Sequence, residues 1–374
     1  MSANPATQPE RSATIRVMVV DDSAVVRGFI VRILEAEPGI DVVATCANGQ
    51  IAVQQAARLA LDVIILDVEM PVMDGLTAVP KLLAANPHAR IVMASTLTQR
   101  NAGVSLEALQ RGAADYLPKP STSGISTNTD FKRELVEKVF ALGRSVRRST
   151  PTPHAPAATR PAARAPQKAP GTFTLRHAAP SRPQALVIGS STGGPQALLS
   201  LLAALPSAVN VPVLIAQHMP ATFTAILAQH IARASNRPCS EASNGAFLRA
   251  GTITLAPGDF HMEISRDGTT LFTRLNQAPP ENFCRPSVDP LFRSAARLFG
   301  SDVCAVMLTG MGSDGLEGTR TLAAAGAPVI AQDEASSVVW GMPGAIATAG
   351  LCSAVLPLGE IAAHLATVFN GGRR

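Results

Sequence analysis

The chain has 374 residues, of which 47% are hydrophobic and 16% are charged. At roughly 150 residues per domain, this length predicts two or three domains, and the hydrophobic fraction excludes a largely disordered chain. No stretch reaches the roughly 18 uninterrupted apolar residues that a membrane span needs, and the first residues lack the apolar core of a signal peptide. We therefore expect a cytoplasmic protein with no segment inserted into a membrane.

Cysteine spacing and charge distribution exclude further classes. The five cysteines are scattered with no CxxC pair, which excludes a disulfide framework and argues against a zinc site, so we expect each to be a small buried hydrophobe. The net charge of +5 suggests nucleic acid, but no carboxylate occurs between Lys138 and Ser240, and the basic excess lies in a Pro/Ala-rich stretch. A basic linker explains the charge, and we expect no nucleic acid as a partner.

This linker separates two series of alternating strand and helix patterns. Before it, apolar runs such as IRVMVV and VIIL alternate with helical patterns, and runs such as QALVIG and VPVLIAQ do so after it. Such alternation predicts parallel sheets with helices on both faces. The expected fold class is therefore α/β, with two doubly wound parallel-sheet domains at residues 15–143 and 184–370 and a flexible linker at 144–183. The pair Asp267-Gly268 predicts a β-hairpin insertion in the second domain.

Polar side chains follow the apolar runs of the first domain. Asp21 and Asp22 follow one run, Asp67 follows another, and Ser95 and Lys119 follow two more. Ligands of open parallel sheets bind beyond the carboxyl ends of the strands, so we expect these side chains to converge. Crowded carboxylates repel unless a hard cation such as Mg²⁺ lies among them, and such a metal suits phosphoryl transfer onto a carboxylate. A single strand-end aspartate is often only a helix cap, but the ordered set predicts a site.

The motifs VVDDSAVVR and LDVEMPVMDG, followed by Ser95 and Lys119, resemble the receiver domain of two-component response regulators. The resemblance covers residues 15–143 and implies a flavodoxin-like fold with Asp67 as the phosphoacceptor. It further implies Mg²⁺ as the cofactor for phosphorylation, binding of the phosphoryl group by Ser95 and Lys119, and Tyr116 in place of the switch aromatic. The implied metal ligands are Asp21, Asp22, Asp67 and the backbone carbonyl of Glu69.

In the second domain, the glycine-rich turn GSSTGGP at residues 189–195 joins a predicted strand to a predicted helix. Such glycines can cradle the phosphate of a dinucleotide, or they can lift a nucleophilic serine on a sharp turn. Dinucleotide binding expects an acidic residue about 20 positions further on. No carboxylate occurs from Pro195 through Ser240, and the next strand ends at Gln217-His218. This favours acyl transfer, because a serine nucleophile needs a neighbouring base.

His218 is the histidine expected at the carboxyl end of a strand beside this turn, and it is the preferred base; His261, at the start of the hairpin, is a weaker candidate. A base of this kind needs a carboxylate that fixes its tautomer. Asp314 follows the run DVCAVML in another glycine-rich turn and is the preferred partner. The weaker candidates are Asp289, Asp302, Asp333 and Glu334.

Six motifs of the second domain resemble the catalytic domain of the protein-glutamate methylesterase of bacterial chemotaxis: GSSTGGPQAL, AQHMP, APGDFH, RPSVDPLFRSAA, VMLTGMGSDG and QDEASSVVWGMP. That family fuses a receiver to a Rossmann-like esterase domain. The resemblance implies Ser191 as nucleophile, His218 as base and Asp314 as the carboxylate that orients it, with no cofactor for the esterase. The implied oxyanion donors are the backbone N–H groups of Thr192 and Met311.

The adjacent hydroxyl of Ser190 competes with Ser191 for the role of nucleophile, and alignment to the turn favours Ser191. Trp340 stands where relatives usually have a smaller aromatic residue.

The resemblance also implies an activity and partners. It implies phosphorylation-activated hydrolysis of glutamate γ-methyl esters, with deamidation of glutamines, on methyl-accepting chemotaxis receptors, and a chemotaxis histidine kinase as the source of phosphate. Two interpretations from other classes are a receiver-controlled, non-catalytic receptor-binding adaptor and a DNA-binding regulator. The complete set of candidate catalytic residues argues against the adaptor, and no helix-turn-helix pattern follows the receiver.

Overall fold

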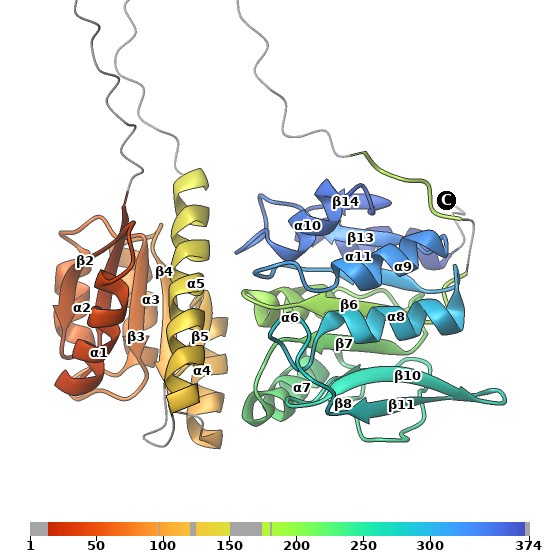
Figure 1. Ribbon diagram of the computed structural model, residues 1–374, viewed down its shortest axis with the longest axis horizontal. Coiled ribbons are helices and arrows are strands. Elements are labelled where there is room, and N and C mark those ends of the chain that lie inside the picture. The colour runs from red at the N-terminus through yellow and green to blue at the C-terminus, as the bar shows by residue number, and fades with distance from the viewer. Residues whose placement is uncertain (1–13, 97, 120–124, 150–173, 180–181, 371–374) are drawn as a thin grey trace, which may run out of the picture. The chain divides into compact units, whose positions relative to one another are not determined.

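The computed structural model describes residues 14–96, 98–119, 125–149, 174–179 and 182–370, which form two compact units (Figure 1). Each unit is built around one parallel β-sheet with helices packed on it. The predicted α/β class with two parallel-sheet domains is therefore confirmed. Within the described ranges, no helix is both long and apolar enough to cross a membrane.

The sheet of the first unit has five parallel strands in the order β2-β1-β3-β4-β5. The strands are β1 (Ile15–Val20), β2 (Ile40–Cys46), β3 (Val63–Asp67), β4 (Arg90–Ser95) and β5 (Asp115–Pro118). Every residue of the central strand β3 is buried, as expected for a parallel strand with both faces covered. This order is that of the flavodoxin-like fold, whose ligands bind at the carboxyl ends of the strands.

Short polar caps start the helices that follow the strands. The helices of this part of the chain are α1 (Ala24–Glu35), α2 (Gly49–Ala56), α3 (Gly75–Ala85), α4 (Gln99–Gln110) and α5 (Ile125–Ser149). Asp74 accepts a hydrogen bond from the Thr77 N–H at 2.7 Å, so it serves as a helix cap. Phe29 of α1 stacks on Phe131 of α5 with ring centroids 5.9 Å apart, while α2 packs against α3.

The expected linker is shorter than its composition predicts. Helix α5 continues through residues 144–149, where Val146 is buried and Arg147 forms an ion pair with Asp62 at 2.7 Å. At the other end, the Arg176 N–H donates to Cys352 O at 3.0 Å and the Ala179 N–H donates to Gly326 O at 3.0 Å. These contacts attach residues 174–179 to the second unit. Of the rest of the predicted linker, residues 150–173 and 180–181 lie outside the described residues.

The sheet of the second unit has seven strands, all paired in parallel, in the order β14-β13-β12-β6-β7-β9-β8. From β6 the chain builds outward through β7 to one edge and then returns to the other side of β6 with β12. The strand order therefore reverses between β6 and β12, which is where open α/β sheets bind their ligands. The strands are β6 (Leu186–Ser190), β7 (Val213–Gln217), β8 (Cys239–Glu241), β9 (Ile253–Leu255), β12 (Cys304–Met307), β13 (Val329–Gln332) and β14 (Ala354–Leu356).

Helices cover this sheet in two groups, and the predicted hairpin is present. Helix α6 (Gly194–Ala203) packs against α7 (Ala221–Ser235) and α11 (Leu358–Phe369), and α8 (Val288–Phe299) packs against α9 (Leu316–Ala324), which contacts α10 (Met342–Thr348). Strands β10 (His261–Asp267) and β11 (Thr270–Asn276) form the hairpin beside α8 (Figure 1). Gly268 turns this hairpin with a φ of 55°.

Gly75 is the glycine that lets helix α3 begin directly behind strand β3. A Cβ atom at this position would lie 2.1 Å from the carbonyl oxygen of Asp67, which no small adjustment can relieve. A Cβ at Gly28, an exposed position inside helix α1, would meet nothing within 4 Å. Gly75 is therefore required by a close contact with the backbone, whereas Gly28 can be replaced by alanine without a clash.

We predict that Gly75→Ala lowers the free energy of unfolding of the first unit by about 1–3 kcal/mol, because the backbone beside Asp67 must move. Gly28→Ala is the matched control and raises that free energy by about 0.5–1 kcal/mol through helix propensity. Urea unfolding followed by circular dichroism measures both changes. The fluorescence of Trp340, the single tryptophan, reports on the second unit and keeps its midpoint. Equal stability of the two variants would contradict the close approach.

Candidate functional site

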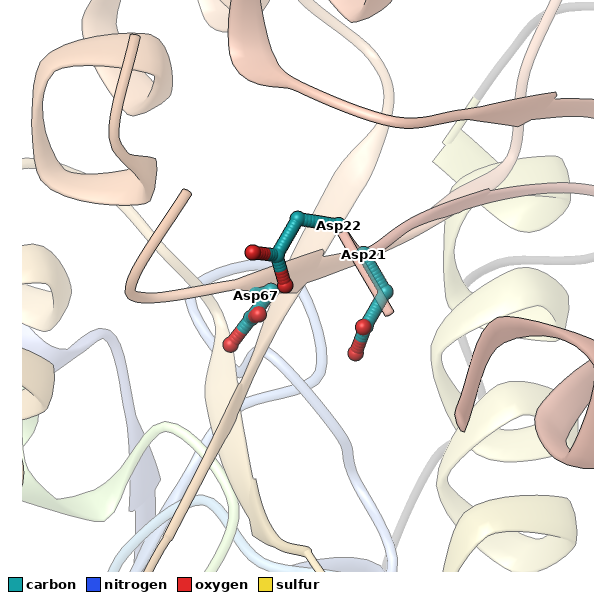
Figure 2. Close-up of side chains that lie close together, drawn as sticks. All are labelled: Asp21, Asp22 and Asp67. Carbon is teal, nitrogen blue, oxygen red and sulfur yellow. The ribbon is translucent and has the colours of Figure 1, made fainter. Parts of the chain in front are cut away.

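The first unit brings three of the predicted acidic residues together at the carboxyl ends of β1 and β3. One ligand oxygen from each of Asp21, Asp22 and Asp67 lies within 4.8 Å of the others (Figure 2). Asp21 and Asp67 are only 1% and 4% exposed, whereas Asp22 is exposed. Hard carboxylate oxygens at this spacing, open to solvent on one side, fit a cation such as Mg²⁺.

Lys119 supplies the positive charge in this cluster. Its ammonium nitrogen lies 2.7 Å from Asp21 Oδ2 and 2.7 Å from Asp67 Oδ1. Burial raises the pKa of Asp67 to about 6, and Lys119 offsets part of this rise while the neighbouring Asp21 adds to it. One lysine therefore does not balance the carboxylates, which favours a further cation beside them.

The structure shows the positions of three other residues predicted for this site, but it does not show a role for each of them. The backbone N–H of Lys119 donates to the Ser95 carbonyl oxygen at 2.7 Å. The buried Ser95, at the end of β4, and the half-buried Lys119, after β5, therefore lie at the same edge of the sheet. The side chain of Glu69 is exposed, and its predicted carbonyl ligand stays a prediction. The ring of Tyr116 is buried beneath the Lys138 ammonium group, which lies 5.0 Å from the ring centroid.

Strand register places Ser191 and His218 side by side in the second unit. Ser190 of β6 pairs with Gln217 of β7, and Ser191 and His218 are the next residues on these adjacent parallel strands. The backbone N–H of His218 donates to the backbone carbonyl oxygen of Ser190 at 3.2 Å. Neighbouring strands run about 4.8 Å apart, so both side chains begin at the same edge of the sheet.

The two adjacent serines have different surroundings. Ser190 is fully buried, and its hydroxyl donates to Gln217 Oε1 at 2.7 Å. Ser191 is half-buried, and no described residue hydrogen-bonds its hydroxyl. A buried hydroxyl that already donates a hydrogen bond stabilises the fold, whereas an accessible hydroxyl can contact a substrate. The geometry supports Ser191 as the candidate nucleophile.

Asp314 reaches His218 from the turn after β12. Its Oδ2 lies 2.6 Å from His218 Nε2. The carboxylate is 2% exposed and lies at the N-terminus of helix α8, where it accepts the Val288 N–H at 2.6 Å and the Ser287 hydroxyl at 2.7 Å. The Gly315 N–H adds a bond of 2.8 Å. Backbone donors at a helix N-terminus stabilise a buried anion, so this carboxylate has a site prepared for its charge.

The two members of this pair influence each other's protonation. Burial would raise the pKa of Asp314, but the hydrogen bond and charge of His218, with the donors of Ser287 and Val288, hold that pKa well below its usual range. Burial would lower the pKa of His218, but Cys284 and Asp314 outweigh burial and raise it to about 10. Asp314 is therefore an anion, and Nε2 of His218 carries the proton between them.

The weaker candidates have structural partners instead. The Ser287 N–H donates to Nδ1 of the buried His261 at 3.2 Å, and His261 Nε2 lies 3.1 Å from Pro279 O, so backbone groups use both ring nitrogens. Asp289 Oδ1 accepts the Gly318 N–H in the first turn of α9 at 2.6 Å. Asp302 bonds Gln184, and Asp333 accepts from Ser336. Each of these bonds serves local structure, which favours His218 and Asp314 over these four side chains.

The turn after β12 also approaches Ser191. The Ser191 N–H donates to Thr309 O at 3.1 Å, and a Cβ at Gly310 would lie 2.9 Å from the Ser191 Cβ. Only glycine therefore allows the two turns to approach this closely. Met311 comes next in the chain and is half-buried at the same rim, while Thr192 is buried. Their predicted role as oxyanion donors stays a prediction.

Several residues of this site were missed by sequence reasoning. Gln217 is 1% exposed, and its Nε2 donates to Ser191 O and His218 O, each at 3.1 Å. Asn282 donates to Asp314 Oδ1 at 2.9 Å. Cys284 is half-buried with its sulfur 3.3 Å from His218 Nδ1. Cys239 is half-buried as well, so the expectation of a buried hydrophobe is wrong for these two cysteines. A polar strand end could have indicated Gln217, but no local signal indicates the other two.

Together, the two units define a response-regulator receiver joined to a hydrolase domain. The response regulator receiver domain family matches residues 17–125, and the CheB methylesterase family matches residues 186–365.

Curated relatives match the chain over nearly its whole length. A protein named protein-glutamate methylesterase/protein-glutamine glutaminase 1 from Paramagnetospirillum magneticum is 54% identical over 96% of each chain. A namesake from Rhodospirillum rubrum is 53% identical over 98% of each. The crystal structure of the Thermotoga maritima CheB methylesterase catalytic domain is 36% identical, covering 50% of this chain and 98% of that one, with a TM-score of 0.49. The chain belongs to the protein-glutamate methylesterase/protein-glutamine glutaminase family.

We predict that Asp314→Asn lowers the free energy of unfolding of the second unit by about 3–5 kcal/mol at neutral pH, because it leaves the buried His218 charge without its partner. Because folding lowers the pKa of Asp314, its carboxylate stabilises the fold fully at pH values above its ordinary pKa of 3.8. This stabilisation is lost as the pH falls below 3.8. The difference in the free energy of unfolding between Asp314→Asn and wild type therefore becomes smaller at acidic pH. Trp340 fluorescence during urea unfolding at several pH values measures it.

The control for this measurement is Asp267→Asn, at the exposed tip of the hairpin, which leaves stability unchanged within about 0.5 kcal/mol. A difference between Asp314→Asn and wild type that is constant over the whole pH range would contradict the assignment.

Proposed function

We propose that this chain hydrolyses γ-glutamyl methyl esters of methyl-accepting chemotaxis receptors, releasing methanol, and deamidates receptor glutamines at the same site. The observation that carries the proposal is the 2.6 Å contact between His218 Nε2 and the buried Asp314 carboxylate, at the strand end next to Ser191. The names of relatives aligned over nearly the full chain supply the substrate class.

The proposed chemistry begins with the tautomer of His218. In the neutral form of His218, the proton stays on Nε2 with the anionic Asp314 as its acceptor, so Nδ1 is the nitrogen that can act as a base. Ser191 Oγ attacks the ester carbonyl carbon while its proton passes to Nδ1, and that proton then leaves with methanol. Water, activated in the same way, cleaves the acyl-enzyme and restores Ser191.

Backbone groups at the same rim are proposed to hold the negative oxygen of the tetrahedral intermediate. The N–H groups proposed for this are those of Thr192, beside the nucleophile, and Met311, in the turn that approaches it. Each donor of this kind is typically worth on the order of a hundredfold or more in rate. The same machinery deamidates glutamine if the imidazolium protonates the departing ammonia.

The receiver is proposed to control this hydrolysis through phosphorylation of Asp67 by a chemotaxis histidine kinase. Mg²⁺ held by Asp21, Asp22, Asp67 and the carbonyl of Glu69 would offset the charge of the phosphoryl group. Lys119 already contacts Asp67, and Lys119 with Ser95 would bind the phosphoryl oxygens. We place the receiver at residues 15–143, continued to residue 149 by the end of α5, and the esterase at 184–370, with residues 174–179 attached to it. We further propose that the protein acts in the cytoplasm, with no nucleic-acid partner and no membrane insertion.

Ser191→Ala is expected to lower the rate of methanol release from methylated receptors by at least about 10⁴-fold, because it removes the nucleophile. Ser190→Ala is the matched variant and keeps activity within about tenfold. It costs about 1 kcal/mol of stability, because Gln217 Oε1 loses its donor. Methanol measured by gas chromatography decides the matter. Activity retained in Ser191→Ala and lost in Ser190→Ala would move the nucleophile by one residue, and no release by wild type would favour an adaptor.

Phosphorylation is expected to raise the initial rate of methanol release by about 5- to 150-fold, the usual range of coupling between sites. The rate is measured with and without a small phosphodonor and Mg²⁺. Asp67→Asn abolishes the stimulation, since no carboxylate remains to accept the phosphoryl group. Asp74→Asn, which alters the nearby cap of α3 outside the cluster, keeps it. A wild-type rate of methanol release that does not change when the phosphodonor is added would refute regulation by the receiver.

A further inference from the structure

Both ring nitrogens of His218 have partners in the structure, and neither partner is Ser191. Nε2 contacts Asp314 at 2.6 Å, and Nδ1 lies 3.3 Å from the sulfur of Cys284. Sulfur hydrogen bonds are longer than those of oxygen, so this separation is that of a hydrogen bond between the thiol and Nδ1. Since Nε2 is committed to Asp314, the thiol occupies the nitrogen that the proposed mechanism needs.

The segment that carries Cys284 is held firmly at that place. Glu281 and Cys284 exchange two backbone hydrogen bonds of 3.2 and 2.9 Å. The carboxylate of Glu281 forms two bonds with the Arg293 guanidinium on α8, at 2.9 and 2.6 Å. Asn282 links Asp314 and Asp289 through its side-chain amide. The contacts of Glu281 and Asn282 thus position the thiol.

Two residues of this segment adopt a backbone conformation that is uncommon for non-glycine side chains. Asn282 has a φ of 51° and Phe283 has a φ of 62°. Such conformations persist only when surrounding contacts enforce them, and they cluster at functional sites. Their effect here is to turn the chain so that Asn282 meets Asp314 while Cys284 meets His218.

We propose that Cys284 is a positioning residue for the hydrolysis: its thiol holds Nδ1 of His218 in the resting chain and competes with Ser191 for that nitrogen. Whether the shared proton lies on sulfur or on nitrogen, the Nδ1 lone pair is engaged and cannot accept the Ser191 proton. Ser191 becomes reactive when its hydroxyl displaces the thiol. The inference rests on the proposed function, because it concerns the base of that reaction.

The charges around His218 agree with this competition. The titratable groups that face the imidazole are Asp314 on one nitrogen and Cys284 on the other, with Asp289 behind Asp314 through Asn282. Cys284 raises the pKa of His218 together with Asp314, against the effect of burial. Removing the thiol therefore lowers that pKa, and the neutral imidazole is present at lower pH.

The test measures the rate at which a fluorophosphonate labels Ser191 in the full-length chain, as a function of pH, alongside methanol release. Cys284→Ala is expected to label about 3- to 10-fold faster at pH 7, the weight of a typical hydrogen bond. The midpoint of its pH profile moves to lower pH by about one pH unit or more. Cys284→Ser keeps a donor of similar size and falls between wild type and Cys284→Ala. Cys239→Ser, at the other half-buried cysteine, behaves as wild type.

An independent readout is the ¹⁵N spectrum of histidine-labelled chain, with the His218 ring assigned by His218→Gln. The His218 titration midpoint is expected to fall in both Cys284 variants. A pH profile and titration midpoint that do not move, or labelling that slows in Cys284→Ala, would overturn the inference, because the thiol would then only support the fold. Labelling that follows these expectations without any methanol release would sink the proposed substrate but not the role of Cys284.

Discussion

The second unit depends on one buried charge, the carboxylate of Asp314. With 2% exposure it can remain ionised only because donors surround it, including the N–H of Val288 and the hydroxyl of Ser287 at the start of helix α8. The same carboxylate bonds His218. One anion therefore joins the turn after β12, the N-terminus of α8 and the end of β7, and by holding Nε2 it leaves Nδ1 as the nitrogen that Cys284 and Ser191 can approach.

Sheet topology explains why these groups meet although they are far apart in sequence. Strands β12, β6 and β7 are neighbours, and the turns that follow them carry Asp314, Ser191 and His218. The first unit uses the same rule, because Asp21 and Asp22 follow β1 and Asp67 ends the adjacent strand β3. In both units, parallel strands bring polar ends to one edge, and the difference lies in the chemistry placed there.

Much of this arrangement could be predicted from the sequence, because it follows from the periodicity of the apolar residues and from the position of polar residues at strand ends. Alternating strand and helix patterns predicted both sheets, and polar residues at strand ends predicted Asp67 and His218. Asn282 and Cys284 could not be found in this way, since they lie on an irregular segment whose path depends on the Glu281–Arg293 ion pair and on contacts with Asp314. Linker composition likewise misplaced its ends, because tertiary contacts extend α5 and hold residues 174–179.

Attack by the hydroxyl of Ser191 can be observed by acid-quenching the enzyme during turnover of methylated receptor and mapping its peptides by mass spectrometry. We expect a glutamyl ester that links the receptor to Ser191, formed with the first equivalent of methanol. Methanol release with the covalent adduct on Ser190 or Cys284 would contradict it.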